Sequence, residues 1–167
     1  MSAQSLQLLH SLGLGLAVAG LLTAIYRYLT DQPASFRLLQ GGGAANTFAL
    51  VGAGGAGWNG LATGTGVNVR GASVTLDSGA GDSAFTQIGS GGGAIDTGVV
   101  PVGNVDGAIN VVSTVGGIVI DGGNGARAYA QIGHGGHGRT GDFTGEIQLV
   151  SNADLSLLGG GSAGAHA

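Results

Sequence analysis

Two stretches of the chain align without a gap: VTLDSGAGDSAFTQIGSGG at residues 74–92 and IVIDGGNGARAYAQIGHGG at residues 118–136. An earlier copy covers residues 39–55, and a fourth begins within residues 155–167. Equivalent aliphatic residues are 37, 44 and 37 positions apart, at Leu39, Leu76, Ile120 and Leu157. A period of this length is typical of a stacked repeat array, in which each unit buries its apolar face against its neighbours.

Each unit consists of short alternating segments separated by glycine-rich turns. A first strand is predicted at residues such as 74–76 or 118–120, and a second at 84–88 or 128–132. Third strands follow a Gly-Gly loop, at residues 67–69, 109–111 and 147–149. Period-two alternation with glycine punctuation indicates strands and turns, and three faces per unit favour a triangular β-solenoid. We therefore predict an all-β repeat domain of three to four units over residues 36–167, with the insert 94–103 looping out of the ladder.

Stacking of equivalent positions predicts columns of like side chains. Phe48, Phe85 and Tyr129 should form an aromatic stack, and Gln87 and Gln131 a ladder of side-chain amides. The aspartates Asp77 and Asp121 also occupy equivalent positions, each at the edge of a glycine turn. Such placement indicates turn caps or a structural ladder, because short acidic side chains often bond to the backbone of their own turn.

Composition excludes several classes of protein. The chain has 167 residues, of which 38 are glycine, without the strict every-third spacing of collagen. Only 8% of residues are charged, lysine is absent, and the formal net charge is −4. Phosphate binding needs several cations, so we expect no nucleic-acid partner. The lack of cysteine excludes disulfides and thiolate metal sites, and the low charge favours a secreted structural protein over a cytosolic enzyme.

Residues 1–30 differ from the repeat domain. Residues 6–26 form an uncharged, mostly apolar run that is long enough for a membrane-spanning helix. Small residues such as Gly13 and Ala17 stand four apart, on one face of the expected helix, where another helix could approach closely. A cleaved signal peptide is disfavoured, since no Lys or Arg precedes the run. We expect a retained helix, either inserted in a membrane or buried by self-assembly.

Candidate chemistry is sparse. His134 and His137 are three residues apart, and Asp142 is the nearest acidic residue, which falls short of the usual four zinc ligands. The turn at residues 79–82 lacks the tandem nonapeptides of calcium-binding repeats, and without lysine no glycine loop matches a phosphate-binding loop. We therefore expect no cofactor, no obligatory metal and no enzymatic activity.

The segment 126–136, and more weakly 84–92, resembles the AYAQIGHGG repeat of large secreted bacterial proteins of the filamentous-haemagglutinin and autotransporter-adhesin type. This resemblance implies a right-handed β-helix and a role in adhesion or surface display. The location that it implies is the bacterial cell surface or the extracellular space.

The fourth unit predicts how the protein assembles. It supplies Leu155 and Leu157, and its residues Ala165, His166 and Ala167 align with residues 128–130. An open apolar coil is a template for strand addition. We expect it to meet the first coil of another copy, around Phe36, Leu38 and Phe48, giving head-to-tail filaments. The alternatives are a surface adhesin module and a membrane-anchored solenoid that does not polymerise.

Overall fold

The computed structural model of the chain describes residues 39–93 and 100–167, which lie within one compact unit, residues 35–167. In these residues the fold is all-β, with no helix. None of the described elements is therefore a helix able to cross a membrane. The predicted N-terminal helix, with Gly13 and Ala17, lies outside the described residues, as do Phe36 and Leu38.

Twelve strands follow one another along the described chain. They are β1 (Leu39–Gln40), β2 (Phe48–Val51), β3 (Val67–Gly71), β4 (Val74–Asp77), β5 (Phe85–Ile88), β6 (Val105–Asp106), β7 (Ile109–Ser113), β8 (Ile118–Asp121), β9 (Tyr129–Ile132), β10 (Phe143–Thr144), β11 (Ile147–Ser151) and β12 (Leu155–Leu158).

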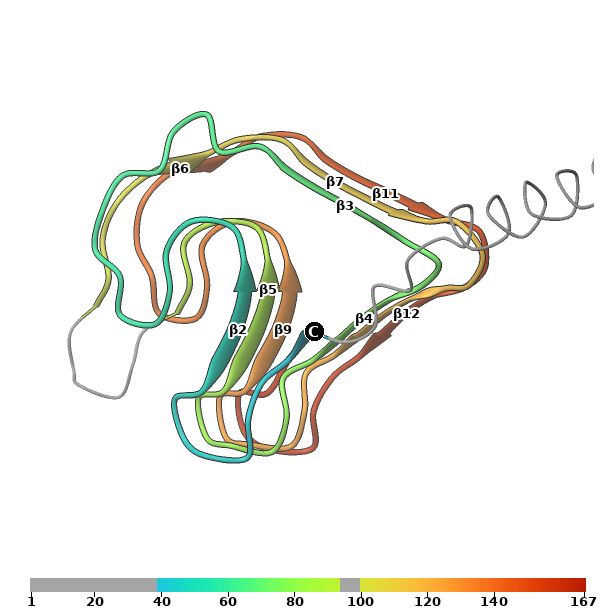
Figure 1. Cartoon of the computed structure of the whole chain (residues 1–167). Coiled ribbons are helices and arrows are strands. Elements are labelled where there is room, and N and C mark those ends of the chain that lie inside the picture. The colour runs from blue at the N-terminus through green and yellow to red at the C-terminus, as the bar shows by residue number, and fades with distance from the viewer. Residues whose placement is uncertain (1–38, 94–99) are drawn as a thin grey trace, which may run out of the picture. The chain divides into compact units, whose positions relative to one another are not determined.

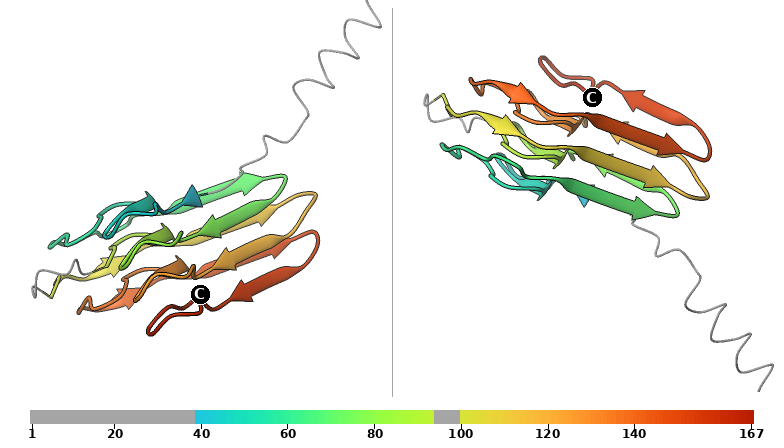
Figure 2. Two further views of the ribbon diagram at one scale, coloured as in Figure 1. Left: turned by 90° about the horizontal axis from the view of Figure 1, so that it is seen from below. Right: turned by 90° about the horizontal axis from the view of Figure 1, so that it is seen from above.

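The strands form a β-solenoid of about three turns. All strand pairs are parallel, and the sheets have the orders β1-β4-β8-β12, β3-β7-β11, β2-β5-β9 and β6-β10. The first coil contains β1 to β3, the second β4 to β7, the third β8 to β11, and β12 begins a fourth. Figure 1 looks down the stack, so that equivalent strands overlap, and Figure 2 shows the same coils as layers from the side.

The register agrees with the spacing of the repeat. Leu39 pairs with Leu76, Leu76 with Ile120, and Ile120 with Leu157. The predicted third strands pair in the same way, since Val67, Ile109 and Ile147 are partners. Both the β-solenoid and the equivalence of these aliphatic positions are therefore confirmed.

Alternation along the strands builds the main core. In β4 and β8 every second residue is buried, and these side chains meet those of β3 and β7 across the coil. Each such side chain contributes about 1.5–3 kcal/mol through removal from water. The cluster of buried residues comprises Val67, Val69, Val74, Leu76, Ile88, Ile109, Val111, Ile118, Ile120 and Ala130.

Aspartates and glycines make the corners after β4 and β8. Oδ1 of Asp77 accepts a hydrogen bond from the backbone N–H of Gly79 at 2.8 Å, and Asp121 does the same with Gly123 at 2.9 Å. Gly123 has a φ of 67°, and a Cβ there would lie only 2.1 Å from the backbone oxygen of Gly79. The corner thus requires glycine both for its backbone conformation and for the close approach of successive coils.

Two details differ from the sequence-based expectation. Residues 94–99 of the insert lie outside the described residues, but Val102 pairs with Thr140, so the end of the insert belongs to the ladder. The second and third coils also contain a fourth strand each, β6 and β10. Both are only two residues long, which is too short to produce a detectable alternation.

The inward column makes a testable prediction. We expect Leu76→Ala to lower the free energy of unfolding by about 2–5 kcal/mol, because the side chain is fully buried between two partners. Thr75→Ala, on the outer side of the same strand, should cost less than about 1 kcal/mol. Urea unfolding followed by circular dichroism measures both. Equal losses for the two variants would contradict the inward register.

Candidate assembly face at the C-terminal coil

The sheet of β2, β5 and β9 is covered on both sides. All four residues of β5 are buried, rather than every second one. Ile88 and Ala130 of this sheet belong to the main core. Figure 1 shows that the chain leaving these strands folds back beside them, so glycine-rich loops cover their other face. Phe85 and Gln87 lie on that face, since their neighbours in the strand face the core.

An aromatic column runs through the space under these loops. The rings of Phe48 and Phe85 stack with centroids 5.0 Å apart and an interplanar angle of 8°. Phe85 and Tyr129 are also 5.0 Å apart, at 2°. The ring of His166 continues the column at 5.3 Å from Tyr129 and 6°. The predicted aromatic stack is confirmed, and an imidazole extends it by one layer.

The Tyr129 side chain, with its hydroxyl, is buried beneath the glycine-rich loops. Its oxygen has no hydrogen-bond partner of normal geometry among the described residues. A Cβ at Gly93 would lie 2.7 Å from this oxygen, so glycine is needed there for the loop to close over the ring. Burial raises the pKa of Tyr129 above the ordinary tyrosine value. The nearby backbone of His137 lowers this pKa, but by less than burial raises it.

The glutamines hold the loops in place. Gln87 and Gln131 are register partners, but their amides do not form the expected ladder. Nε2 of Gln87 donates to the backbone oxygens of Gly133 at 2.8 Å and Gly135 at 3.1 Å, and Nε2 of Gln131 donates to that of His134 at 2.8 Å. The amide-ladder prediction is therefore wrong, because the folded-back loops bring backbone carbonyls within hydrogen-bonding distance of both amides.

Arg139 joins all three coils, which sequence reasoning missed. Its guanidinium donates to the backbone oxygens of Trp58 and Gly60 in the first coil and of Gly103 in the second. It also lies 4.7 Å from the centroid of the Trp58 ring, where a cation is attracted by the ring face. The repeat spacing gave no signal for these contacts, because Arg139 and the residues that it bonds to do not occupy equivalent positions of the repeat.

The last coil exposes side chains that are buried in the coils before it. Leu157 is 58% exposed, while its column partners Ile120 and Leu76 are 4% and 0% exposed. Ile147, Leu149 and Leu155 are likewise exposed at inward positions. The strands β11 and β12 are edge strands, with one neighbour each among the described residues. We call this surface, made by residues 147–167, the end face.

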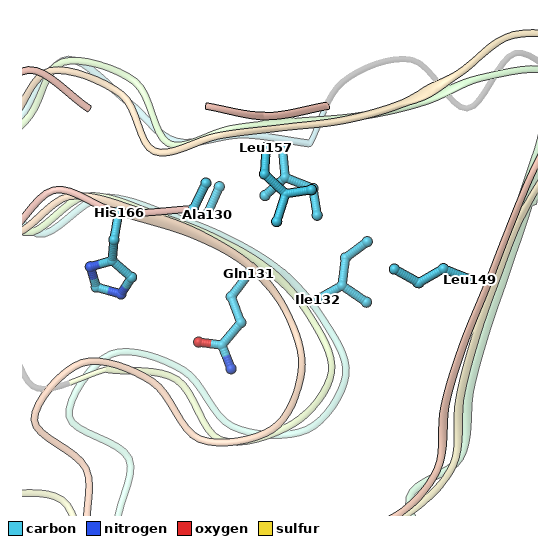
Figure 3. A pocket seen from close by; sticks show the side chains of 8 residues that line it. Ala130, Gln131, Ile132, Leu149, Leu157 and His166 are labelled. Carbon is cyan, nitrogen blue, oxygen red and sulfur yellow. The ribbon is translucent and has the colours of Figure 1, made fainter. Parts of the chain in front are cut away.

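The end face contains an apolar hollow of about 340 Å³. Figure 3 shows Ile132, Leu149 and Leu157 pointing toward one another on one side of β9, with Gln131 and His166 on its other side. The lining residues are Ile120, Ala130, Gln131, Ile132, Leu149, Leu157, His166 and Ala167. Ile120, Leu149 and Leu157 in its wall belong to inward columns of the repeat, which are open to solvent here.

Those residues predicted for assembly that the structure describes lie at the two ends of the stack. His166 pairs with Tyr129, which confirms the alignment of residues 165–167 with 128–130. Leu155 and Leu157 lie in β12, Ala165 in the turn after it, and Ala167 beside the hollow. Phe48 is 47% exposed at the other end of the aromatic column.

The three residues considered as metal ligands, His134, His137 and Asp142, do not form a cluster of ligands among the described residues. Nδ1 of His134 accepts a hydrogen bond from Ser90 N–H at 3.1 Å, and Nε2 donates to the backbone oxygen of Gly107 at 2.7 Å. Both ring nitrogens are thus occupied. Asp142 is exposed and accepts a hydrogen bond from the side chain of Asn104. No group of three potential ligands exists in the described part of the chain.

Comparisons with known proteins give one partial match. Residues 6–57 match the model of a family of unknown function, DUF6949. The matched range includes the apolar segment and strands β1 and β2, but not the repeats that follow. No curated protein matches the chain. No solved structure matches it either.

The tyrosine in the aromatic column makes a prediction about pH. We expect Tyr129→Phe to keep or raise the stability at pH 7, because it removes a buried hydroxyl without a partner. A raised pKa in the folded state means that the neutral form is favoured. The stability gained is therefore present below about pH 10, the ordinary tyrosine value, and is lost as the pH rises above it. Thermal unfolding between pH 7 and 11 should show a steeper alkaline loss in the wild type than in Tyr129→Phe. A variant that is much less stable at pH 7 would show that the hydroxyl is bonded.

The hydrogen bonds of Arg139 to the first two coils lead to a second prediction. Arg139→Met should destabilise the fold by about 1–3 kcal/mol or more, because three backbone carbonyls lose their donor. Arg70→Met is the matched control, since Arg70 is exposed on the outer side of β3, and it should change the stability by about 0.5 kcal/mol or less. Urea unfolding compares the two. Similar stabilities of both variants would mean that Arg139 contributes no more than a surface arginine.

Proposed function

We propose that this protein is a structural, self-assembling β-solenoid whose copies stack head to tail, with the end face of one copy covered by the first coil of the next. The observation that carries the proposal is the exposure of the inward columns on the end face, with Leu157 58% exposed. Contiguous apolar surface of this kind marks an interaction site.

The register supports a second copy as the occupant. The aliphatic column begins at Leu39 and reaches Leu157, and the aromatic column begins at Phe48 and reaches His166. A copy that continues the parallel ladder would place Leu39 over Leu157 and Phe48 over His166. Its Leu50 and Val51 would then lie over the hollow. The two ends are complementary because both are layers of one repeat.

Backbone and charge support the same contact. Strands β1 and β2 lie at one edge of their sheets. At the opposite edge lie β12 and the segment around His166, which pairs with β9, so parallel pairing between copies would supply partners for both edges. Residues 155–167 contain no Lys, Arg, Asp or Glu, so no charge opposes the approach of an apolar coil. A contact between two different surfaces does not close on itself and yields filaments.

The proposed setting is the bacterial surface or the extracellular space, and the proposed role is not catalytic. The resemblance to haemagglutinin-type and adhesin repeats and the low content of charged residues support this setting. The engagement of Asp77 and Asp121 in their own turns supports a structural role for these carboxylates. Residues 6–26 would either pack between subunits or enter a membrane.

A pair of neighbouring leucines tests the assembly. Leu157→Lys puts a charge on the end face, where a second copy would have to bury it at high cost, so we expect monomers. Leu158→Lys is the matched control, because Leu158 is also about half exposed but lies on the outer side of the same strand, in the column of Asp77 and Asp121. It should assemble like the wild type. Negative-stain microscopy and sedimentation velocity measure the polymers, and circular dichroism checks the fold.

The outcomes separate the proposal from its rivals. Filaments of normal length from Leu157→Lys would show that the end face is not the joint. A wild-type protein that stays monomeric at all concentrations would contradict assembly and favour the adhesin module, or the membrane-anchored solenoid if it partitions into lipid vesicles. Deletion of residues 155–167 is less informative, because the third coil carries the same columns at Ile118, Ile120 and Tyr129.

A further inference from the structure

The fold brings together two histidines that are 29 residues apart in the sequence. The rings of His137 and His166 have centroids 6.4 Å apart and are tilted by 48°. His137 lies in the exposed glycine loop after β9, and His166 lies on the aromatic column at the end face. Sequence reasoning paired His137 with His134, whose two ring nitrogens are both occupied.

His166 is held in the form that binds metal ions. Its Nδ1 lies 2.9 Å from the backbone oxygen of Gly164, and since a carbonyl only accepts, Nδ1 carries the proton. Nε2 of the neutral ring is then the unprotonated nitrogen, with its lone pair in the ring plane. Metal-binding histidines usually donate their other N–H to a carbonyl in this way, which fixes the tautomer and the ring orientation.

Neither histidine is required by the repeat. The offset of 44 residues that relates Gly91 to Gly135 places His137 where the second coil has Gly93. His166 stands where the earlier coils have Tyr129, Phe85 and Phe48. The earlier coils therefore stack with a glycine at the position of His137 and an aromatic ring at the position of His166. Only later in the stack do both positions carry an imidazole.

We propose that His137 and His166 form a two-histidine site for a divalent transition-metal ion, with water completing the coordination. Metal–nitrogen bonds of about 2.0–2.1 Å place an ion roughly 3 Å from each ring centre, so rings that share an ion are about 5–6.5 Å apart. The observed 6.4 Å is at the upper end of this range, and rotation of the exposed His137 side chain closes the site. Imidazole suits copper, nickel and zinc, and Cu²⁺ should bind most tightly of the three.

The site is compatible with stacking but does not depend on it. An imidazole binds a metal in its ring plane, so both faces of His166 stay available for aromatic contacts. Both ligands come from one chain. Binding is therefore expected in the Leu157→Lys protein as well, which separates the result of this test from that of the assembly test.

Titration of the full chain with CuCl₂, followed by calorimetry and electron paramagnetic resonance, tests the site. We expect a bound Cu²⁺ ion whose electron paramagnetic resonance spectrum shows coordination by two imidazole nitrogens. His137→Asn and His166→Asn should each weaken the binding of Cu²⁺ by at least about tenfold. Loss of a residue that only hydrogen-bonds to a metal ligand already lowers metal affinity by about this factor. The double variant should lose the binding of Cu²⁺. Both side chains are exposed, so these variants should fold.

Asp142→Asn is the control, since Asp142 is exposed and bonded to Asn104, and it should bind Cu²⁺ like the wild type. Undiminished binding in the folded double variant would overturn the proposal. A spectrum with a single nitrogen, or loss of binding in Asp142→Asn, would also overturn it. ZnCl₂ should raise the melting temperature of the wild type more than that of the double variant, because an ion held only by the folded state stabilises it.

Discussion

Parallel, in-register pairing between coils is the constraint on which the rest of the structure depends. Each strand bonds to the equivalent strand of the coils before and after it, so equivalent residues lie directly over one another. A shift by one residue would move every inward side chain of a strand to the outside. The unit of packing is therefore a column, such as that of Leu76 and Ile120, rather than a single residue. At corners such as Gly123 the residue must be glycine, since a Cβ there would meet the backbone of the neighbouring coil.

The folded-back loops create a second buried region beside the main core. Because they cover the outer face of β2, β5 and β9, side chains that would face solvent in a simple solenoid become buried. The aromatic column fills this space, and Gln87 bonds to the loop carbonyls. The arrangement leaves polar atoms without partners among the described residues, namely the hydroxyl of Tyr129 and Oε1 of Gln87. Burial of such groups is costly, and the apolar area that the rings bury, together with their stacking, offsets this cost.

The sequence predicted what depends on the period, and missed what depends on the path of the loops. Equivalent positions in adjacent coils are 37 or 44 residues apart, so the spacing predicted the register, the aliphatic column and the aromatic column. Contacts between positions that are not equivalent have no such signal. Arg139 reaches Trp58, 81 residues away, and His137 meets His166 only because the loop after β9 folds back toward the column. The glutamines show the same limit, since their alignment was predicted but their bonding partners come from those loops.

The end face follows from the same constraint. A stack of like columns offers the same apolar surface at every layer, so a solenoid stays apart from its neighbours only where a layer departs from the repeat, usually as a polar capping unit. In the last described coil the aliphatic columns continue unchanged through Leu155 and Leu157, and no charged residue replaces them. The departure is in the aromatic column, where His166 takes the place of a phenyl or phenol ring. It keeps the parallel stacking on Tyr129, and its Nδ1 bonds to the backbone oxygen of Gly164. An imidazole ring can therefore stack on Tyr129 while the nitrogens at its edge are solvated, which a phenyl ring cannot do.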